Sequence, residues 1–235
     1  MHDGEPAPGA MTKIPGRKGT VRRWSAPLLL VLLEQSAAAL AQEEVTQPEW
    51  GVGNTWSYAR ISMPTTLATA TVKSNYTLTV RSKDDRYRLS YVASEDGVTT
   101  QPSPLFWSLD TNFMNRQGAG GQWQEFPWYR WPAKQGSEWG GLWIFPNTSA
   151  PSDCHAKARG WEDVKVAAGT FRALRIEIAC SFMYNANTAS GTGQLQDIVW
   201  YSPRVKRHVR MERKTFAHVY TLADQIEELT AFNVD

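Results

Sequence analysis

The stretch from Trp161 to Cys180, WEDVKVAAGTFRALRIEIAC, decides the fold class because it contains two strands and the turn that joins them. In its second half, apolar side chains recur at every second position from Leu174 to Cys180, which predicts a strand with one buried face. Ala167-Ala168-Gly169 separates the halves, and glycine can adopt the positive φ angle that a tight hairpin needs. The stretch therefore predicts an antiparallel β-hairpin.

The same alternation recurs on both sides of this hairpin, and turn residues separate the segments that carry it. Asp84-Asp85, Glu95-Asp96-Gly97 and Ser202-Pro203 are the predicted turns. No long segment has helical periodicity, so the sequence predicts an all-β chain with an antiparallel sheet. The further strands are expected over Asn54–Ser62, Thr69–Arg81, Arg86–Val92, Gln194–Tyr201 and Val205–Lys214.

Three segments are less regular. Residues 100–155 contain six prolines and predict short strands separated by long, Trp-rich loops. Asn185–Gly193 is polar and predicts a loop, while Phe216–Val234 predicts two strand pieces joined by a loop. The motif G-x-x-W occurs at Gly53 and again at Gly136, which indicates a glycine turn that begins a strand with an inward tryptophan.

Residues 1–41 have the features of a cleaved export signal. Basic residues at 17–23 precede the apolar run APLLLVLL at 26–33, and Ala39-Leu40-Ala41 matches a cleavage site. The apolar run is too short to span a bilayer, so we expect no transmembrane anchor in the mature chain, residues 42–235, which form one domain. This signal predicts a periplasmic or secreted protein.

Charge excludes one class of partner. The chain has 25 basic and 23 acidic residues, of which residues 1–41 hold five and three, so residues 42–235 carry 20 of each. Proteins that bind nucleic acid concentrate basic residues in a patch, and this neutral balance predicts no nucleic-acid partner.

Cys154 and Cys180 are the two cysteines of the chain. An exported protein meets an oxidising compartment, so the pair predicts a disulfide rather than two free thiols. His155 follows Cys154, but neighbouring strand residues point to opposite faces, which disfavours a shared metal site.

The sequence lacks the known signatures of catalysis. It contains no G-x-S-x-G elbow, no phosphate-binding loop and no His-Glu-x-x-His pair. We therefore predict no catalytic residue, no metal ligand and no cofactor. His155, His208 and His218 are expected on exposed faces, and the carboxylate pairs Glu162-Asp163 and Glu227-Glu228 leave a hydrolase of unknown specificity as an alternative.

Aromatic residues are the distinctive feature of the composition. The chain has 11 tryptophans, of which Trp56, Trp139, Trp161 and Trp200 lie in predicted strands and are expected in the core. Others lie in a segment rich in proline and glycine, where less core is expected, and clustered aromatics outside a core mark ligand sites. The candidate ligand-binding residues are Trp123, Trp128, Tyr129, Trp131 and Trp143.

Four elements of the sequence, taken in order, resemble a known group. They are Gly53-x-x-Trp56-x-Tyr58, the Pro132 to Trp139 stretch, the hairpin from Val164 to Ile176, and Trp200-Tyr201-Ser202-Pro203 with the strand that follows. Together they resemble a group of bacterial exported proteins whose fold is similar to the lipoprotein-carrier (LolA/LolB-like) half-barrel. The resemblance implies a curved antiparallel sheet with an apolar concave side, and it supplies no catalytic residues.

The leading functional hypothesis is a non-catalytic protein that binds an apolar or amphipathic ligand, a lipid or lipoprotein-like molecule, in the cell envelope. Planar stacking of the tryptophans on a sugar is the alternative, which would make the domain a glycan-binding module. A carrier requires an apolar concavity, whereas a glycan module requires coplanar tryptophans at the surface.

Overall fold

The computed structural model describes residues 43–235 except for residues 67, 117–120, 145–151, 187–188 and 218–219. The predicted export signal lies outside the described residues. Within the described ranges the regular elements are strands, and no helix there is long and apolar enough to cross a membrane.

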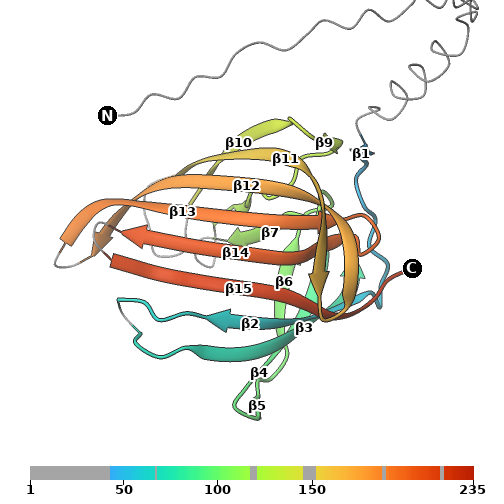
Figure 1. The fold of residues 1–235 in the computed structure, drawn as a ribbon, viewed down its shortest axis with the longest axis horizontal. Coiled ribbons are helices and arrows are strands. Elements are labelled where there is room, and N and C mark those ends of the chain that lie inside the picture. The colour runs from blue at the N-terminus through green and yellow to red at the C-terminus, as the bar shows by residue number, and fades with distance from the viewer. Residues whose placement is uncertain (1–42, 67, 117–120, 145–151, 187–188, 218–219) are drawn as a thin grey trace, which may run out of the picture. The chain divides into compact units, whose positions relative to one another are not determined.

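The strands differ in length along the chain: those between residues 98 and 143 are short, and those after residue 151 are long and curved (Figure 1). Prolines interrupt the first group, whereas the second group is dense in β-branched and aromatic residues. The strands are β1 Glu44–Val45, β2 Thr55–Ser62, β3 Val72–Lys83, β4 Tyr87–Glu95, β5 Val98–Thr99, β6 Ser103–Trp107, β7 Phe113–Arg116, β8 Trp123–Glu125, β9 Ala133–Lys134, β10 Glu138–Trp143, β11 Ser152–Val166, β12 Gly169–Ala186, β13 Ala189–Ser202, β14 Arg207–Ala217 and β15 Tyr220–Asn233.

One large antiparallel sheet contains 13 of the described strands, in the order β10-β11-β12-β13-β14-β15-β2-β3-β4-β6-β7-β8, with β5 paired to β4. The sheet curls until it is nearly closed into a barrel (Figure 1). Its two edge strands, β10 and β8, lie at the seam. At the seam, the backbone N–H of Ile144 donates to Gln124 Oε1 at 3.1 Å. The predicted all-β, curved antiparallel fold is confirmed.

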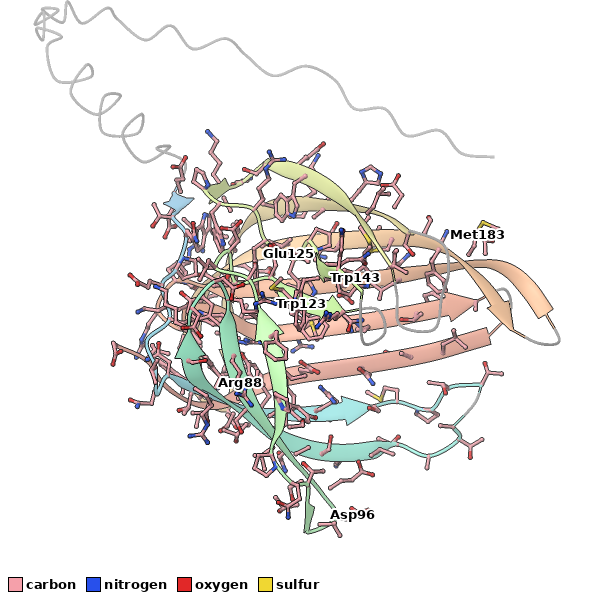
Figure 2. All side chains as sticks on the ribbon, turned by 180° about the vertical axis from the view of Figure 1, so that it is seen from behind. Arg88, Asp96, Trp123, Glu125, Trp143 and Met183 are labelled. Carbon is pink, nitrogen blue, oxygen red and sulfur yellow. A yellow bond between two sulfur atoms is a disulfide. The ribbon has the colours of Figure 1, made fainter. Side chains whose placement is uncertain are left out.

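The hairpin quoted at the outset forms β11 and β12 as predicted. Its strands pair from Val166–Gly169 at the turn to Asp153–Ser181 at the far end, and Gly169 has a φ of 133°. Gly53 and Gly136, the glycines of the G-x-x-W motifs, also have positive φ angles, 96° and 87°. Asp96 and Gly97, at the tip of the β4–β5 hairpin (Figure 2), have φ angles of 49° and 81°, as the Asp-Gly turn requires.

One predicted loop forms strands instead. β12 extends to Ala186 and β13 begins at Ala189, so most of the polar segment Asn185–Gly193 belongs to a long hairpin. Gly193 lies opposite Phe182, and a Cβ atom at Gly193 would come within 2.4 Å of the Phe182 ring. The ring therefore covers the glycine, which compensates for the weak strand preference of that residue.

The C-terminal segment Phe216–Val234 contains two strand pieces, as predicted: Phe216 and Ala217 end β14, residues 218–219 lie outside the described residues, and Tyr220–Asn233 form β15. The pairing of β15 with β2 shifts between Leu229 and Ala231, which leaves Thr230 as a β-bulge. The bulge changes which residues of β15 face inward without ending the strand.

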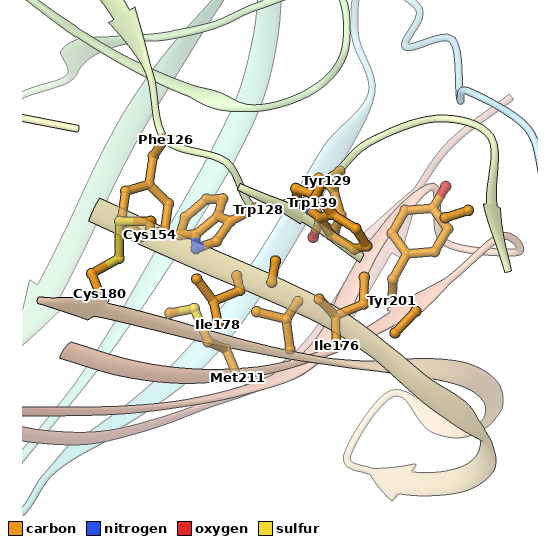
Figure 3. Packing of buried hydrophobic residues seen from close by; sticks show 14 of the residues in the cluster. Phe126, Trp128, Tyr129, Trp139, Cys154, Ile176, Ile178, Cys180, Tyr201 and Met211 are labelled. Carbon is orange, nitrogen blue, oxygen red and sulfur yellow. A yellow bond between two sulfur atoms is a disulfide. The ribbon is translucent and has the colours of Figure 1, made fainter. Parts of the chain in front are cut away.

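Buried side chains form two clusters inside the curved sheet. One lies at the inner face of β10 to β13 and contains the segment from Phe126 to Tyr129, which crosses the interior rather than running outside it (Figure 3). The other joins β2, β3, β4 and β6 to the β11–β12 hairpin and includes Trp50, Trp56 and Trp107. Of the tryptophans expected in the core, Trp56 and Trp139 are buried, whereas Trp161 and Trp200 are half-buried.

Cys154 and Cys180 are direct cross-strand partners on β11 and β12, both are buried, and their Sγ atoms lie at bonding distance, 2.06 Å. A bridge across a sequence separation of 26 residues restricts the unfolded chain. We expect the double variant Cys154→Ala/Cys180→Ala to lose about 3 kcal/mol in the free energy of unfolding, measured by urea denaturation.

The control for this double variant is the wild type unfolded in the presence of a reductant, which should show a similar loss. Alkylation under denaturing conditions without reductant, followed by intact-mass measurement, should leave both thiols unmodified. Two alkylated thiols would contradict the bridge.

Candidate functional site

A cavity of about 270 Å³ lies where the two buried clusters meet inside the sheet. This volume is close to the lower limit of pockets that bind small molecules. The lining side chains come from strands far apart in the sequence and from the Phe126–Tyr129 segment; they are Arg60, Tyr76, Leu78, Tyr91, Leu105, Trp107, Phe113, Phe126, Trp128, Trp143, Arg207, His208, Met211, Arg213 and Glu227.

The lining is amphipathic. Aromatic and aliphatic side chains such as Trp107, Phe126 and Trp143 form most of the wall, and charged side chains gather on the part formed by β2, β14 and β15. The side chains of Arg60 and Arg213 are 28% and 27% exposed, and Leu105 is also partly exposed, so these residues mark where the cavity approaches solvent. An apolar wall with a few placed polar groups is typical of ligand-binding pockets.

A β-bulge brings His208 into the site. Tyr201 of β13 pairs with His208 and Trp200 pairs with Arg210, so Val209 has no partner in the register. Neighbouring residues at a bulge can face the same side of a sheet. His208 and Val209 are accordingly both buried, and the prediction that His208 lies on an exposed face is wrong.

The charged part of the lining, which we call the charged wall, consists of Arg60, Arg207, His208, Arg213 and Glu227, and Glu227 is at its centre. It lies opposite Arg60 in the pairing of β15 with β2, and Arg60 Nε donates to Glu227 Oε1 at 2.7 Å. The hydroxyl of Tyr76 donates to the other oxygen, Oε2, at 2.5 Å. His208 Nε2 lies 3.8 Å from the same Oε2, which is beyond hydrogen-bond distance. Both carboxylate oxygens are therefore occupied by protein donors.

These contacts fix the protonation states of the wall. Burial alone would raise the pKa of Glu227, but the neighbouring His208, the positive charge of Arg60 and the Tyr76 hydroxyl together lower this pKa to about 2. Burial lowers the pKa of His208 below its ordinary value of 6.5, with the charge of Arg207 acting in the same direction. At neutral pH the wall therefore contains an ionised Glu227 and a neutral His208.

A second buried ion pair joins the wall to the aromatic segment. Asp197 lies opposite Arg213 in the pairing of β13 with β14, and its two carboxylate oxygens accept from Arg213 Nε at 2.8 Å and Nη2 at 2.6 Å. The indole Nε1 of Trp128 also donates to Asp197 Oδ2, at 3.1 Å. Asp197 thus fixes both a charged and an aromatic side chain of the cavity lining.

The five aromatic residues proposed from the sequence fall into three places. Trp128 and Trp143 line the cavity. Tyr129 is buried and stacks on the half-buried Trp131 with ring centroids 5.3 Å apart, outside the cavity lining. Trp123 packs against Phe106 in the part of the sheet that short strands form. Figure 2 shows the positions of Trp123 and Trp143.

The expectation of little core around these aromatics is wrong for Trp128, Tyr129 and Trp143, which are all buried. Proline and glycine in this segment indicate irregular backbone, but the segment lies inside a curved sheet and fills it.

The other candidate groups of the sequence do not converge. Glu227 faces the interior while Glu228 is half-exposed and pairs with Arg210 at 2.8 Å, so the two carboxylates point to opposite faces of β15. Glu162 and Asp163 are exposed, as is His155, and His218 lies outside the described residues. No cluster of three or more potential metal ligands occurs in the described ranges.

A larger depression, of about 820 Å³, lies over the outer side of β10 to β13. Its charged side chains already have protein partners: Lys157 pairs with Glu138, and Arg159 Nε lies 2.6 Å from Glu177 Oε2. It lies on the outer face of the sheet rather than between the two buried clusters, and we therefore take the smaller, interior cavity as the candidate site.

The sequence patterns gave no indication of Arg60, Tyr76, Asp197, Arg207 or Arg213, named Glu227 only as one of a carboxylate pair, and placed His208 on an exposed face. One further signal was available for two of them: Arg213 and Glu227 occupy positions that share a face with apolar neighbours on their strands. A charged residue at an inward position of a strand predicts a buried partner or a ligand.

No protein-family model matches the sequence, and no curated protein sequence matches it either. Two solved structures are similar in shape. One is a putative lipoprotein from Parabacteroides distasonis, with 13% identity, a TM-score of 0.46, and coverage of 82% of this chain and 100% of that one. The other is a putative exported protein with YmcC-like fold from Bacteroides fragilis, with 11% identity, a TM-score of 0.43, and coverage of 80% and 99%. Neither is described as a lipoprotein carrier, so the resemblance to that group stays a prediction.

Proposed function

We propose that this protein is a non-catalytic binding protein whose interior cavity holds a small amphipathic molecule. The observation that carries the proposal is the cavity of about 270 Å³, bordered by both buried clusters and lined by aromatic side chains on one part and charges on another. Well-packed protein interiors leave few spaces larger than a water molecule, so a space of this size and polarity favours a ligand.

The size of the cavity favours a short ligand. A water molecule takes about 30 Å³ of liquid, so the cavity has room for about nine groups of water or methylene size. That volume suits a medium-length acyl chain or a compact ring system. Each buried methylene contributes about 0.8 kcal/mol of driving force before the ligand's ordering cost is subtracted.

The predicted export signal over residues 1–41 favours a periplasmic or secreted location for this role. The ligand would then come from the cell envelope or the medium. Mass spectrometry of small molecules extracted from protein purified from its own envelope should identify an amphipathic compound in about equimolar amount.

A neutral probe tests the cavity directly. N-phenyl-1-naphthylamine fluoresces more strongly in apolar surroundings, and we expect it to bind the wild type with 1:1 stoichiometry. Leu105→Trp would fill the partly exposed end of the cavity and should weaken probe binding at least tenfold.

Leu142→Trp is the matched control, because Leu142 is 68% exposed and lies outside the cavity. This variant should bind the probe as the wild type does. Probe binding that Leu105→Trp leaves unchanged, with the fold confirmed by circular dichroism, would contradict a cavity site.

A further inference from the structure

Arg207 is a buried cation without an anionic partner among the described residues. Three arginines line the cavity, and two of them are paired: Arg60 with Glu227, and Arg213 with Asp197. Arg207 is 3% exposed, forms no ion pair with the described residues, and has no hydrogen-bond acceptor there for Nε or Nη1. The described charged groups of the cavity wall and Asp197 therefore leave one positive charge uncompensated.

Tryptophan rings compensate this charge only in part. The Arg207 guanidinium carbon lies 4.8 Å from the ring centroid of Trp107, 5.3 Å from that of Trp50 and 5.5 Å from that of Trp56. A cation and an aromatic face attract each other when both are out of water. The attraction is weaker than the hydration that a buried ion loses, so the site retains a demand for an anion.

His208 lies beside this cation and is also incompletely bonded. Its Nε2 is buried and has no hydrogen-bond partner within the described part of the chain. Burial keeps the ring neutral. Nε2 can therefore either carry a proton and donate a hydrogen bond to an oxygen, or lack the proton and accept a hydrogen bond from a hydroxyl. Arg207 and His208 both line the cavity, which places two unused polar groups at one site.

We infer that the ligand of this cavity is an anionic amphiphile whose carboxylate or phosphate group binds at Arg207 and His208, with its chain along Trp128, Phe126 and Trp143. The inference rests on the proposed function and names its ligand class. An oxyanion would supply the missing countercharge of Arg207 and an acceptor for His208. The apolar wall would cover the chain.

A cationic or neutral head group fits the same wall less well. The carboxylate of Glu227 is already bound by Arg60 and Tyr76, and that of Asp197 by Arg213 and Trp128. A cation would therefore have to displace an existing buried contact and would also add to the uncompensated positive charge. A neutral alcohol could form a hydrogen bond with His208 but would leave the positive charge of Arg207 uncompensated.

Four ligands with the same ten-carbon chain test the head group: decanoate, decyl phosphate, decan-1-ol and decyltrimethylammonium. Each is measured by displacement of N-phenyl-1-naphthylamine from the wild type. We expect decanoate or decyl phosphate to bind at least tenfold more tightly than decan-1-ol and the trimethylammonium compound to bind most weakly. The order of the two anions distinguishes a carboxylate from a phosphate ligand.

Arg207→Met keeps an unbranched apolar stem and removes the charge of the side chain. We expect it to weaken binding of the preferred anion at least tenfold and to change decan-1-ol binding less than twofold. Arg88→Met is the control, since Arg88 is exposed on β4 and lies outside this cavity. If Arg207→Met does not fold, Arg207→Lys replaces it. This variant keeps the charge and should lose less than tenfold in anion affinity relative to the wild type.

The two proposals fail in different ways. If the probe binds but the four head groups displace it equally, the anion site is overturned and the apolar cavity stands. If neither the probe nor any of the four ligands binds, the proposed function itself is overturned.

Discussion

Glu227→Gln should lower the free energy of unfolding by about 3 kcal/mol, because it removes the charge that compensates Arg60 inside the sheet. Removing one partner of a buried ion pair costs about 3–5 kcal/mol, and Arg60 is 28% exposed, so water can relieve part of the cost. Tyr76 also loses a charged acceptor for its hydroxyl. Urea denaturation at pH 7 measures the loss.

The same carboxylate predicts how stability depends on pH. The pKa of Glu227 falls from its ordinary value of 4.5 to about 2 on folding, which corresponds to about 3 kcal/mol of stability. That contribution is complete above the unfolded pKa and is lost as the pH falls through the folded one. The wild type should therefore lose stability more steeply than Glu227→Gln between pH 5 and pH 2, and the two should converge near pH 2.

Two variants separate this effect from a general sensitivity of β15. Glu228→Gln changes the next residue, whose half-exposed side chain pairs with Arg210 on the other face, and should cost less than about 1 kcal/mol. In the double variant Arg60→Met/Glu227→Gln the unpaired cation is gone, and it should lose less than the sum of the two single variants. Equal losses for Glu227→Gln and Glu228→Gln would contradict the buried pair.

The sheet was predictable where alternation and turn chemistry agree. From Leu174 to Cys180 the burial of every second residue follows from the pattern, and the positive φ of Gly169 follows from the hairpin. Alternation failed at bulges, because one inserted residue reverses which positions face inward. The bulge at Val209 hid the inward direction of His208.

The charged wall of the site was harder to predict. Arg60 and Glu227 are 167 residues apart, and Asp197 and Trp128 are 69 apart, so their contacts depend on strand order and register. Periodicity indicates on which face of its strand a side chain lies, but not which residue lies beside it on the next strand. The composition predicted that Trp128 and Trp143 belong to one aromatic cluster. It did not predict their burial, which depends on how the curled sheet encloses the chain segment that carries them.

Asp197→Ala should be the most damaging single change in the wall, with a loss of about 3–5 kcal/mol. The Asp197 side chain is fully buried and binds both Arg213 and Trp128, so its removal leaves the partly exposed Arg213 guanidinium without its anion and the indole N–H of Trp128 without its acceptor. Burial disfavours the charged form of Arg213, yet the pKa of Arg213 is raised because Asp197 outweighs that penalty. Chemical denaturation at neutral pH measures the loss.

Asp197→Asn separates the two roles of this carboxylate, because its amide oxygen can still accept from Trp128 while the charge opposite Arg213 is lost. The near-ultraviolet circular dichroism spectrum should stay close to that of the wild type in Asp197→Asn and change more in Asp197→Ala, and N-phenyl-1-naphthylamine binding should follow the same order. The control is Asp224→Asn, whose partner Lys214 lies 4.0 Å away near the surface, and it should cost less than about 1 kcal/mol. Probe binding retained in a folded Asp197→Ala variant would show that Trp128 does not shape the site, since that substitution removes the carboxylate acceptor of its indole N–H.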